Sequence, residues 1–197
     1  GMYGSPAAGT PGLLACYLPG TLWLMSLTGR TLAHALPPFP PVFFNEALAV
    51  NAAGPVDNAG EREPWIELLN DGPLPVSLEG WYLADSFTEL TRWPFPAGFQ
   101  IEGRALRLLW ADGEPSQTTP ADAHTSFQLV NGGVLALVRI QAGVPMIVDY
   151  LRLPTLPVDI SYGSMPDGQT RIRDLLASPT PLHRNRHVPP PQLANVP

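Results

Sequence analysis

Short apolar runs separated by turn residues constrain the fold of this chain more than any other feature. From Val42 onward, runs of strand composition alternate with clusters of Gly, Pro, Asn and Asp, and few windows show helical periodicity. The runs that we expect to be strands are 42–50, 64–70, 76–83, 90–95, 104–111, 125–130, 133–141 and 144–153. Many short strands at such spacing are typical of a sandwich or barrel. The pattern therefore predicts an all-β fold.

The connections between these runs carry turn chemistry of their own. Asn131-Gly132 stands between two apolar runs, and Asn-Gly supplies the positive φ values of a two-residue hairpin turn. Ala142-Gly143 is expected to reverse the chain again, into the run that begins at Val144. We expect two hairpins at these positions. Residues 52–63 and 112–123 are polar loops, which we expect at the surface, where loops often carry binding functions.

Composition excludes several classes of function. The 197 residues carry 11 basic and 17 acidic side chains, a net charge of −6, and all the basic residues are Arg, so lysine chemistry is excluded. An acidic chain lacks the basic footprint that nucleic-acid binding requires. The single cysteine, Cys16, excludes an intrachain disulfide. The charged fraction of 14% is well below the usual value of about 25%, and is typical of a β protein that covers part of its surface in an assembly.

A series of segments matches a known family in order and composition. The segments are Val42-Phe43-Phe44-Asn45-Glu46-Ala47, Trp65-Ile66-Glu67-Leu68-Leu69-Asn70, Val76-Ser77-Leu78-Glu79-Gly80-Trp81-Tyr82-Leu83-Ala84-Asp85, Arg92-Trp93-Pro94-Phe95-Pro96-Ala97-Gly98, Ser161-Tyr162-Gly163-Ser164-Met165-Pro166-Asp167-Gly168 and Ser178-Pro179-Thr180-Pro181. Over roughly residues 42–185 the chain resembles the lamin-tail domain family. It departs from that pattern at Leu182-His183-Arg184-Asn185, where the family usually has a small Gly-Ala-Pro-Asn-like ending.

The resemblance implies an immunoglobulin-like β-sandwich. In bacteria, domains of this family usually serve as accessory modules of surface or secreted proteins and not as catalysts. We therefore expect three parts: an apolar, Pro-rich N-terminal segment at 1–41, a lamin-tail-like sandwich at 42–185, and a Pro-rich tail at 186–197.

Two interpretations of the N-terminal segment stay open. The apolar run 13–27 is interrupted by Pro19-Gly20, so we expect no transmembrane span, but with the later Ala33-His34-Ala35 it resembles a signal peptide and its cleavage site. Alternatively, an extended assembly strand pairs with the sheet edge of a neighbouring molecule. The residues of that strand are Leu22, Trp23, Leu24, Met25 and Leu27.

Three carboxylates share strand faces with apolar neighbours: Glu46, Glu67 and Asp85. Such a group is costly unless it is paired or hydrogen-bonded. One interpretation is an acidic site that holds a cation such as Ca²⁺ or contains an acid of raised pKa. The other, which we favour, is structural, with these groups accepting backbone N–H bonds or pairing with Arg92 or Arg107.

The aromatic residues of the strand runs have two interpretations as well. They are Trp65, Trp81, Trp93, Phe95 and Trp110. We expect most of them to fill the core, the alternative being a platform for carbohydrate or peptide.

The sequence contains no recognisable motif for catalysis. There is no G-x-S-x-G segment, and His34, His124, His183 and His187 match no metal-binding spacing. We therefore predict a protein that is not an enzyme and requires no cofactor or metal.

The function predicted from these observations is protein binding or tethering in the secreted space or at the cell surface. Its partners are expected to be proteins, a second copy of the chain included, and not nucleic acid. The alternative is a structural subunit whose strand at about residues 13–27 inserts into a neighbour and builds a filament or surface layer. A weaker alternative is an accessory domain for a separate hydrolase.

Overall fold

The computed structural model describes residues 13–18, 21–26, 31–34 and 39–186, which divide between two compact units, 1–39 and 40–197. The smaller unit contains a three-stranded antiparallel sheet of order β1-β2-β3. Its strands are β1 (Leu13–Leu18), β2 (Thr21–Ser26) and β3 (Thr31–His34). Of the predicted assembly strand, Leu22–Met25 lie on β2, which is paired along both edges, and Leu27 lies outside the described residues. The apolar run is therefore not one unpaired strand: it contains β1 and β2, which pair with each other.

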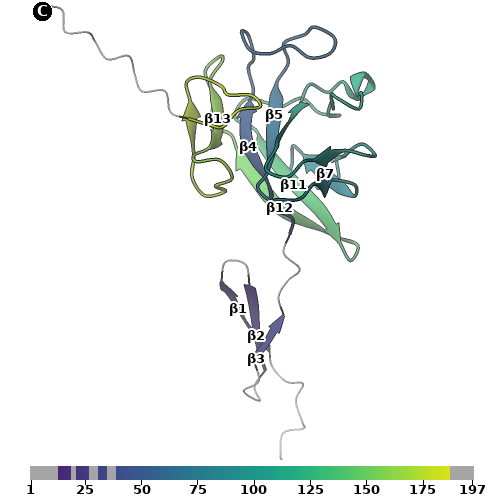
Figure 1. Ribbon diagram of the computed structural model, residues 1–197, viewed down its shortest axis with the longest axis vertical. Coiled ribbons are helices and arrows are strands. Elements are labelled where there is room, and N and C mark those ends of the chain that lie inside the picture. The colour runs from purple at the N-terminus through teal and green to yellow at the C-terminus, as the bar shows by residue number, and fades with distance from the viewer. Residues whose placement is uncertain (1–12, 19–20, 27–30, 35–38, 187–197) are drawn as a thin grey trace, which may run out of the picture. The chain divides into compact units, whose positions relative to one another are not determined.

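The larger unit is an antiparallel β-sandwich (Figure 1). Its five-stranded sheet has the order β10-β5-β4-β13-β14. The strands are β4 (Val42–Leu48), β5 (Trp65–Asn70), β10 (Leu106–Trp110), β13 (Ser161–Ser164) and β14 (Arg173–Leu176). All residues of β4 except Phe43, and all of β5, are buried, as expected for central strands covered on both faces.

The opposing four-stranded sheet has the order β12-β11-β7-β8. Its strands are β7 (Trp81–Ala84), β8 (Trp93–Pro94), β11 (Val134–Gln141) and β12 (Val144–Arg152). A short antiparallel pair consists of β6 (Val76–Ser77) and β9 (Gln100–Ile101). The only helical turn in the described residues is a 3₁₀ turn at Pro115–Gln117. The observed fold is thus all-β, as the sequence pattern predicts.

The inner faces of the two sheets form the main core. Alternate residues of β4 and β5 meet alternate residues of β7 and β11, because successive side chains on a strand point to opposite faces. The central members are Phe44, Ile66, Leu68, Trp81, Leu83, Leu135 and Leu137. Trp93 and Phe95 pack in this same core, at a ring separation of 5.1 Å.

The other two predicted core aromatics are buried elsewhere. Trp65 and Trp110 pack with Leu48 in a smaller cluster on the outer side of the five-stranded sheet. All five aromatic side chains are therefore at most 6% exposed, and the described surface contains no platform built from them.

Most predicted strand runs correspond to strands, with one clear exception. The run 125–130 is not a strand, although Phe127 and Leu129 are buried in the core. The Thr125 hydroxyl donates to the carbonyl of Phe127, and such a local bond competes with ladder formation. The hairpin expected at Asn131-Gly132 is therefore wrong. The Asn131 side chain instead bonds the backbone of Leu156 in both directions, at 2.7 and 2.8 Å.

Candidate functional site

Glu46 and Glu67 lie opposite each other on β4 and β5, and both side chains are completely buried. Glu46 accepts hydrogen bonds from the Ser161 hydroxyl, from the Thr180 hydroxyl at 2.9 Å and from the Thr180 backbone N–H at 3.0 Å. Glu67 accepts from the Asn45 amide at 3.0 Å and from the Leu182 backbone N–H. Each carboxylate thus receives a backbone N–H from the closing segment, residues 178–185.

Burial governs the charge of this pair. It raises the pKa of Glu67 to about 8, against the lowering effect of the donors Asn45 and Leu182. Burial also raises the pKa of Glu46, against the hydrogen bonds from Ser161 and Thr180. Both acids are surrounded by donors that belong to the fold. Their arrangement fastens the closing segment onto the first sheet and leaves no open face for a ligand.

Asp85 does not join Glu46 and Glu67. It follows β7 in the other sheet, where its carboxylate pairs with Arg92 at 2.9 Å. The three carboxylates therefore do not come together as the alternative interpretation, a cation site, requires. Within the described part of the chain, the only trio of acidic, His or Cys side chains that converges closely enough to hold an ion lies elsewhere.

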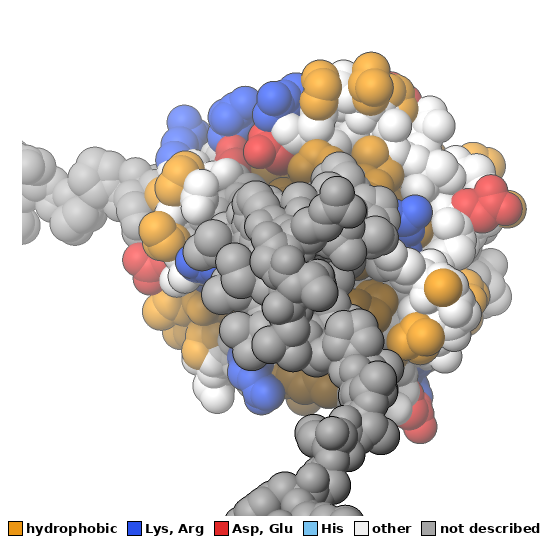
Figure 2. Space-filling model, turned by 90° about the horizontal axis from the view of Figure 1, so that it is seen from below, with side chains coloured by type: hydrophobic (Ala, Val, Ile, Leu, Met, Phe, Trp, Pro, Cys, Tyr) orange, Lys and Arg blue, Asp and Glu red, His pale blue; other side chains and the backbone are white. Residues whose placement is uncertain are grey.

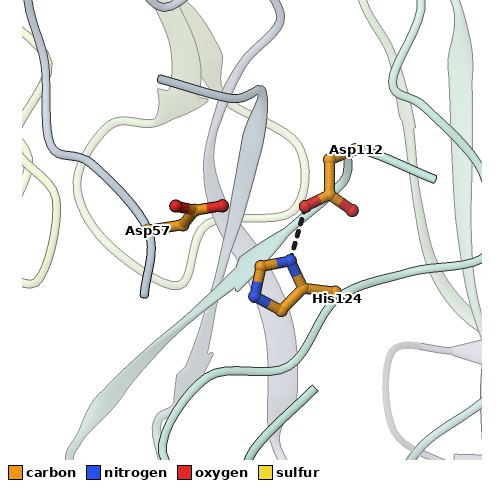
Figure 3. Close-up of side chains that lie close together, drawn as sticks. All are labelled: Asp57, Asp112 and His124. Atoms are coloured by element: carbon orange, nitrogen blue, oxygen red, sulfur yellow. Dashed lines mark hydrogen bonds and ion pairs between the residues drawn. The ribbon is translucent and has the colours of Figure 1, made fainter. Parts of the chain in front are cut away.

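That trio is Asp57, Asp112 and His124, and it forms where the two predicted polar loops meet (Figure 3). One ligand atom from each residue lies within 4.8 Å of the other two, and all three residues are buried. The two loops are also joined directly, since the Asn58 amide donates to the carbonyl of Gln117 at 3.0 Å. We call Asp57, Asp112 and His124 the loop cluster.

Both ring nitrogens of His124 are engaged. Nδ1 lies 2.5 Å from Asp112 Oδ2, and Nε2 lies 2.7 Å from Asn58 Oδ1. The amide nitrogen of Asn58 is committed to Gln117, so the oxygen faces the ring and Nε2 carries a proton. The ring of Trp110 stacks on the imidazole at 6.5 Å between centroids. His124 is therefore fixed in position and in tautomer at Nε2.

In the described chain, only one of the two carboxylate oxygens of Asp57 accepts hydrogen bonds. Its Oδ1 accepts the backbone N–H groups of Ala59 and Glu61, at 2.9 and 2.8 Å. Its Oδ2 is buried and has no hydrogen-bond partner among the described residues. Figure 3 shows the carboxylate of Asp57 directed toward the other two side chains.

Negative charge surrounds the loop cluster. The two loops, 52–63 and 112–123, carry six acidic residues and one basic residue, Arg62. Burial, and then the charges of Asp112, Glu114, Glu61 and Asp57, raise the pKa of the nearby Glu63.

Sequence reasoning did not identify the loop cluster, because it treated His124 as an isolated histidine. Its partners are Asp112, 12 residues earlier at the start of the second loop, and Asn58, 66 residues earlier in the first loop. No spacing of residues along the sequence predicts that these side chains come together. The only available signal was the acidic composition of the two loops.

A second feature is an exposed apolar edge. β12 is an outer strand of the four-stranded sheet, and its exposed large apolar residues are Val144, Met146, Ile147 and Tyr150. β7 pairs only with residues 136–139 of β11, so the end of the β11–β12 hairpin extends beyond it (Figure 1). We call these four residues the β12 edge.

The surface beside the β12 edge is apolar as well. Phe87 packs edge-on against Tyr150 at 5.9 Å, and Arg152 lies over the Phe87 ring at 4.9 Å. Together with Leu90, Phe87 covers a small apolar cluster on the outer face of the sheet. Viewed from below, the sandwich shows groups of apolar side chains separated by charged ones (Figure 2).

Comparisons with known proteins add no relative. The chain matches no family model and no curated protein. Within its described part, no helix is long and apolar enough to cross a bilayer.

Proposed function

We propose that the larger unit is a non-catalytic protein-binding module whose contact surface is the β12 edge. The observation that carries this proposal is the exposure of four large apolar side chains on one strand, with Tyr150 52% and Val144 56% exposed. Tyr150 and Ile147 pair with Ala136 and Val138, which belong to the apolar cluster on the outer face of the sheet, so these two side chains lie on that face beside Phe87. Val144 and Met146 point to the opposite face. Exposed apolar residues that gather in this way often mark an interaction site. Aromatic residues and Met are also enriched in protein interfaces.

The local geometry favours recognition through side chains over addition of a strand. Pro145 has no N–H to offer a new neighbour, and the Arg173 guanidinium already donates to the carbonyl of Tyr150 at 2.9 Å. A partner strand would therefore find the edge obstructed at both ends. The partner that fits this surface is a protein with a complementary apolar patch and an acidic group for Arg152.

The resemblance to lamin-tail domains supports this proposal. It implies an immunoglobulin-like topology for the sandwich and a role as a module of surface or secreted proteins. We extend the proposal accordingly to the secreted space or the cell surface. The buried hydrogen-bonding of Glu46 and Glu67 is consistent with a module that contributes binding and not chemistry.

Site-specific crosslinking tests the proposal. A photoreactive amino acid replaces Ile147 in cells that make the protein. In the matched control it replaces Leu74, an apolar residue just before β6 that is 72% exposed. We expect a discrete protein adduct from position 147 and none from position 74. Equal labelling at the two positions, or no adduct from 147, would contradict the proposal.

A second candidate function rests on the smaller unit. β1 and β3 each leave one strand edge unpaired within the described residues, and four of the six residues in the sequence of β2 are apolar. We propose as the alternative that this sheet joins copies of the chain into a filament or surface layer. A role as accessory domain to a separate hydrolase remains the weaker alternative.

A further inference from the structure

The loop cluster has the composition of a metal site. It offers one imidazole nitrogen and two carboxylates, a set that suits Zn²⁺, Mn²⁺ and related ions better than Ca²⁺, which prefers oxygen ligands alone. Its three members come from two loops that the fold brings together, and each is at most 8% exposed. A buried group of this kind is distinct from an exposed acidic patch.

A second observation, separate from the composition of the cluster, points to a bound cation: the buried Oδ2 of Asp57 accepts no hydrogen bond from the part of the chain that the structure describes. A buried carboxylate oxygen without a hydrogen bond carries a desolvation cost that the fold does not offset. The other oxygen is held by Ala59 and Glu61, so the carboxylate is fixed while Oδ2 stays available. A cation among the three side chains would satisfy it.

His124 is oriented as a metal ligand usually is. Metal-bound histidines commonly donate the second ring N–H to a carbonyl or carboxylate, which fixes the tautomer. Here Nε2–H donates to Asn58 Oδ1, and Asn58 is itself held by Gln117. Nδ1 is thereby the ring nitrogen that faces the Asp112 carboxylate.

The gap between Nδ1 and Asp112 Oδ2 holds a proton, because two lone pairs at 2.5 Å require one between them. A divalent ion that enters displaces this proton, so one M²⁺ is gained and one H⁺ is released. Two ligands of one tetrahedral ion lie roughly 3.3 Å apart, given metal–ligand bonds of about 2.0 Å. The side chains of Asp112 and His124 therefore need to separate by less than about 1 Å, and Asp57, whose ligand atom lies within 4.8 Å of theirs, needs to move toward them.

We propose that Asp57, Asp112 and His124 bind one divalent transition-metal ion of the Zn²⁺ or Mn²⁺ class, which clamps loop 52–63 to loop 112–123. Because the site is buried, the ion acts as a structural clamp and not as a Lewis acid for substrate. The surrounding excess of acidic residues in both loops attracts the cation. This site is independent of the β12 edge.

Calorimetric titration of the full chain with ZnCl₂, MnCl₂, CaCl₂ and MgCl₂, each alongside melting curves, tests the proposal. The variants are Asp57→Asn, which keeps the acceptor for Ala59 and Glu61, and Asp112→Asn, whose amide donates to Nδ1 in place of the shared proton. Both preserve the metal-free contacts, and melting in EDTA verifies this. Asp85→Asn is the matched control, because its Arg92 pair lies outside the cluster.

We expect the wild type and Asp85→Asn to bind one ion and to melt several degrees higher with metal. Both cluster variants should bind at least tenfold more weakly and lose that shift. The proposal is overturned if the wild type binds neither ion at 1 mM, or if both variants bind as tightly as the wild type. Binding of Ca²⁺ or Mg²⁺ without Zn²⁺ or Mn²⁺ would overturn the assignment of the metal class.

Discussion

Glu67 is buried on β5 beneath the closing segment, and burial raises its pKa to about 8 from an ordinary value of 4.5. A group whose pKa is higher in the folded than in the unfolded state favours folding below the unfolded pKa. That contribution is lost as pH rises through the folded value. The buried acids therefore make the protein less stable toward pH 8 than near pH 5.

Replacement of Glu67 by Gln should flatten this pH dependence. Between pH 5 and pH 8 the wild type is expected to lose about 3 kcal/mol of unfolding free energy through Glu67, and the Gln variant does not titrate there. The variant should also be less stable near pH 5, since its amide would face the N–H donor of Leu182 or Asn45. Urea denaturation at a series of pH values measures both effects.

Glu89→Gln is the matched control, because Glu89 lies at the surface in a pair with Arg92. Its pH profile should follow the wild type. Burial also raises the pKa of Glu46 and of Asp149, so only the difference between wild type and Glu67→Gln reports on Glu67. Parallel profiles for the wild type and Glu67→Gln would disprove the assignment.

At this scale the sequence predicts part of the result. The alternation of apolar residues around Glu46 and Glu67 indicates carboxylates among apolar neighbours. Their donors lie on Thr180 and Leu182, more than 110 residues later, and no periodicity encodes that contact. The separation of Asp85 from the pair follows from sheet topology, which strand patterns alone do not determine.

Among the elements, β12 is tied to the opposite sheet by Asp149. A bulge between Phe44 and Glu46 interrupts the β4–β5 ladder, and the Phe44 N–H donates to the Asp149 carboxylate at 2.9 Å. Arg173 of β14 donates to both oxygens of the same group, at 2.7 and 2.9 Å. One carboxylate thus connects β4, β12 and β14.

Asp149→Ala should destabilise the sandwich by about 3–5 kcal/mol, because the buried Arg173 loses its counter-charge and the Phe44 N–H loses its acceptor. Thermal and urea denaturation measure this change. The control is Asp71→Ala, whose pair with Arg104 is more than half exposed and should contribute less than about 1 kcal/mol. Similar losses in the two variants would show that Asp149 is not an inter-sheet tie.

The strand elements were predictable where their residues alternate or form apolar runs. The hairpin at Ala142-Gly143 is confirmed, with φ values of 49° and 80° at the turn. β13 and β14 were not among the expected strands. They are short, and their pairing with β4 and with each other defines them more than their composition does.

For the whole molecule, the two functions proposed above predict different oligomeric states of the full chain. The larger unit has a complete core of its own, so we expect residues 40–197 to be monomeric by light scattering. The filament alternative requires the full chain to form large species that disappear when residues 1–39 are removed. Equal monomer masses for the two proteins would eliminate that alternative.

The fold class of the whole molecule followed from strand spacing and turn residues. Neither the loop cluster nor the β12 edge could be predicted from sequence patterns. The loop cluster depends on the meeting of two loops, and the β12 edge depends on which strand ends the sheet. Neither property belongs to any single segment of the sequence.

The affinity of the partner captured at position 147 for three forms of the protein tests the binding proposal most directly. The forms are the wild type, Ile147→Glu at the β12 edge and Leu74→Glu as an exposed apolar control, each verified to melt like the wild type. A charge placed in an apolar contact should weaken binding at least tenfold for Ile147→Glu, and Leu74→Glu should bind like the wild type. Equal affinity for all three forms would contradict the assignment of the β12 edge as the contact surface.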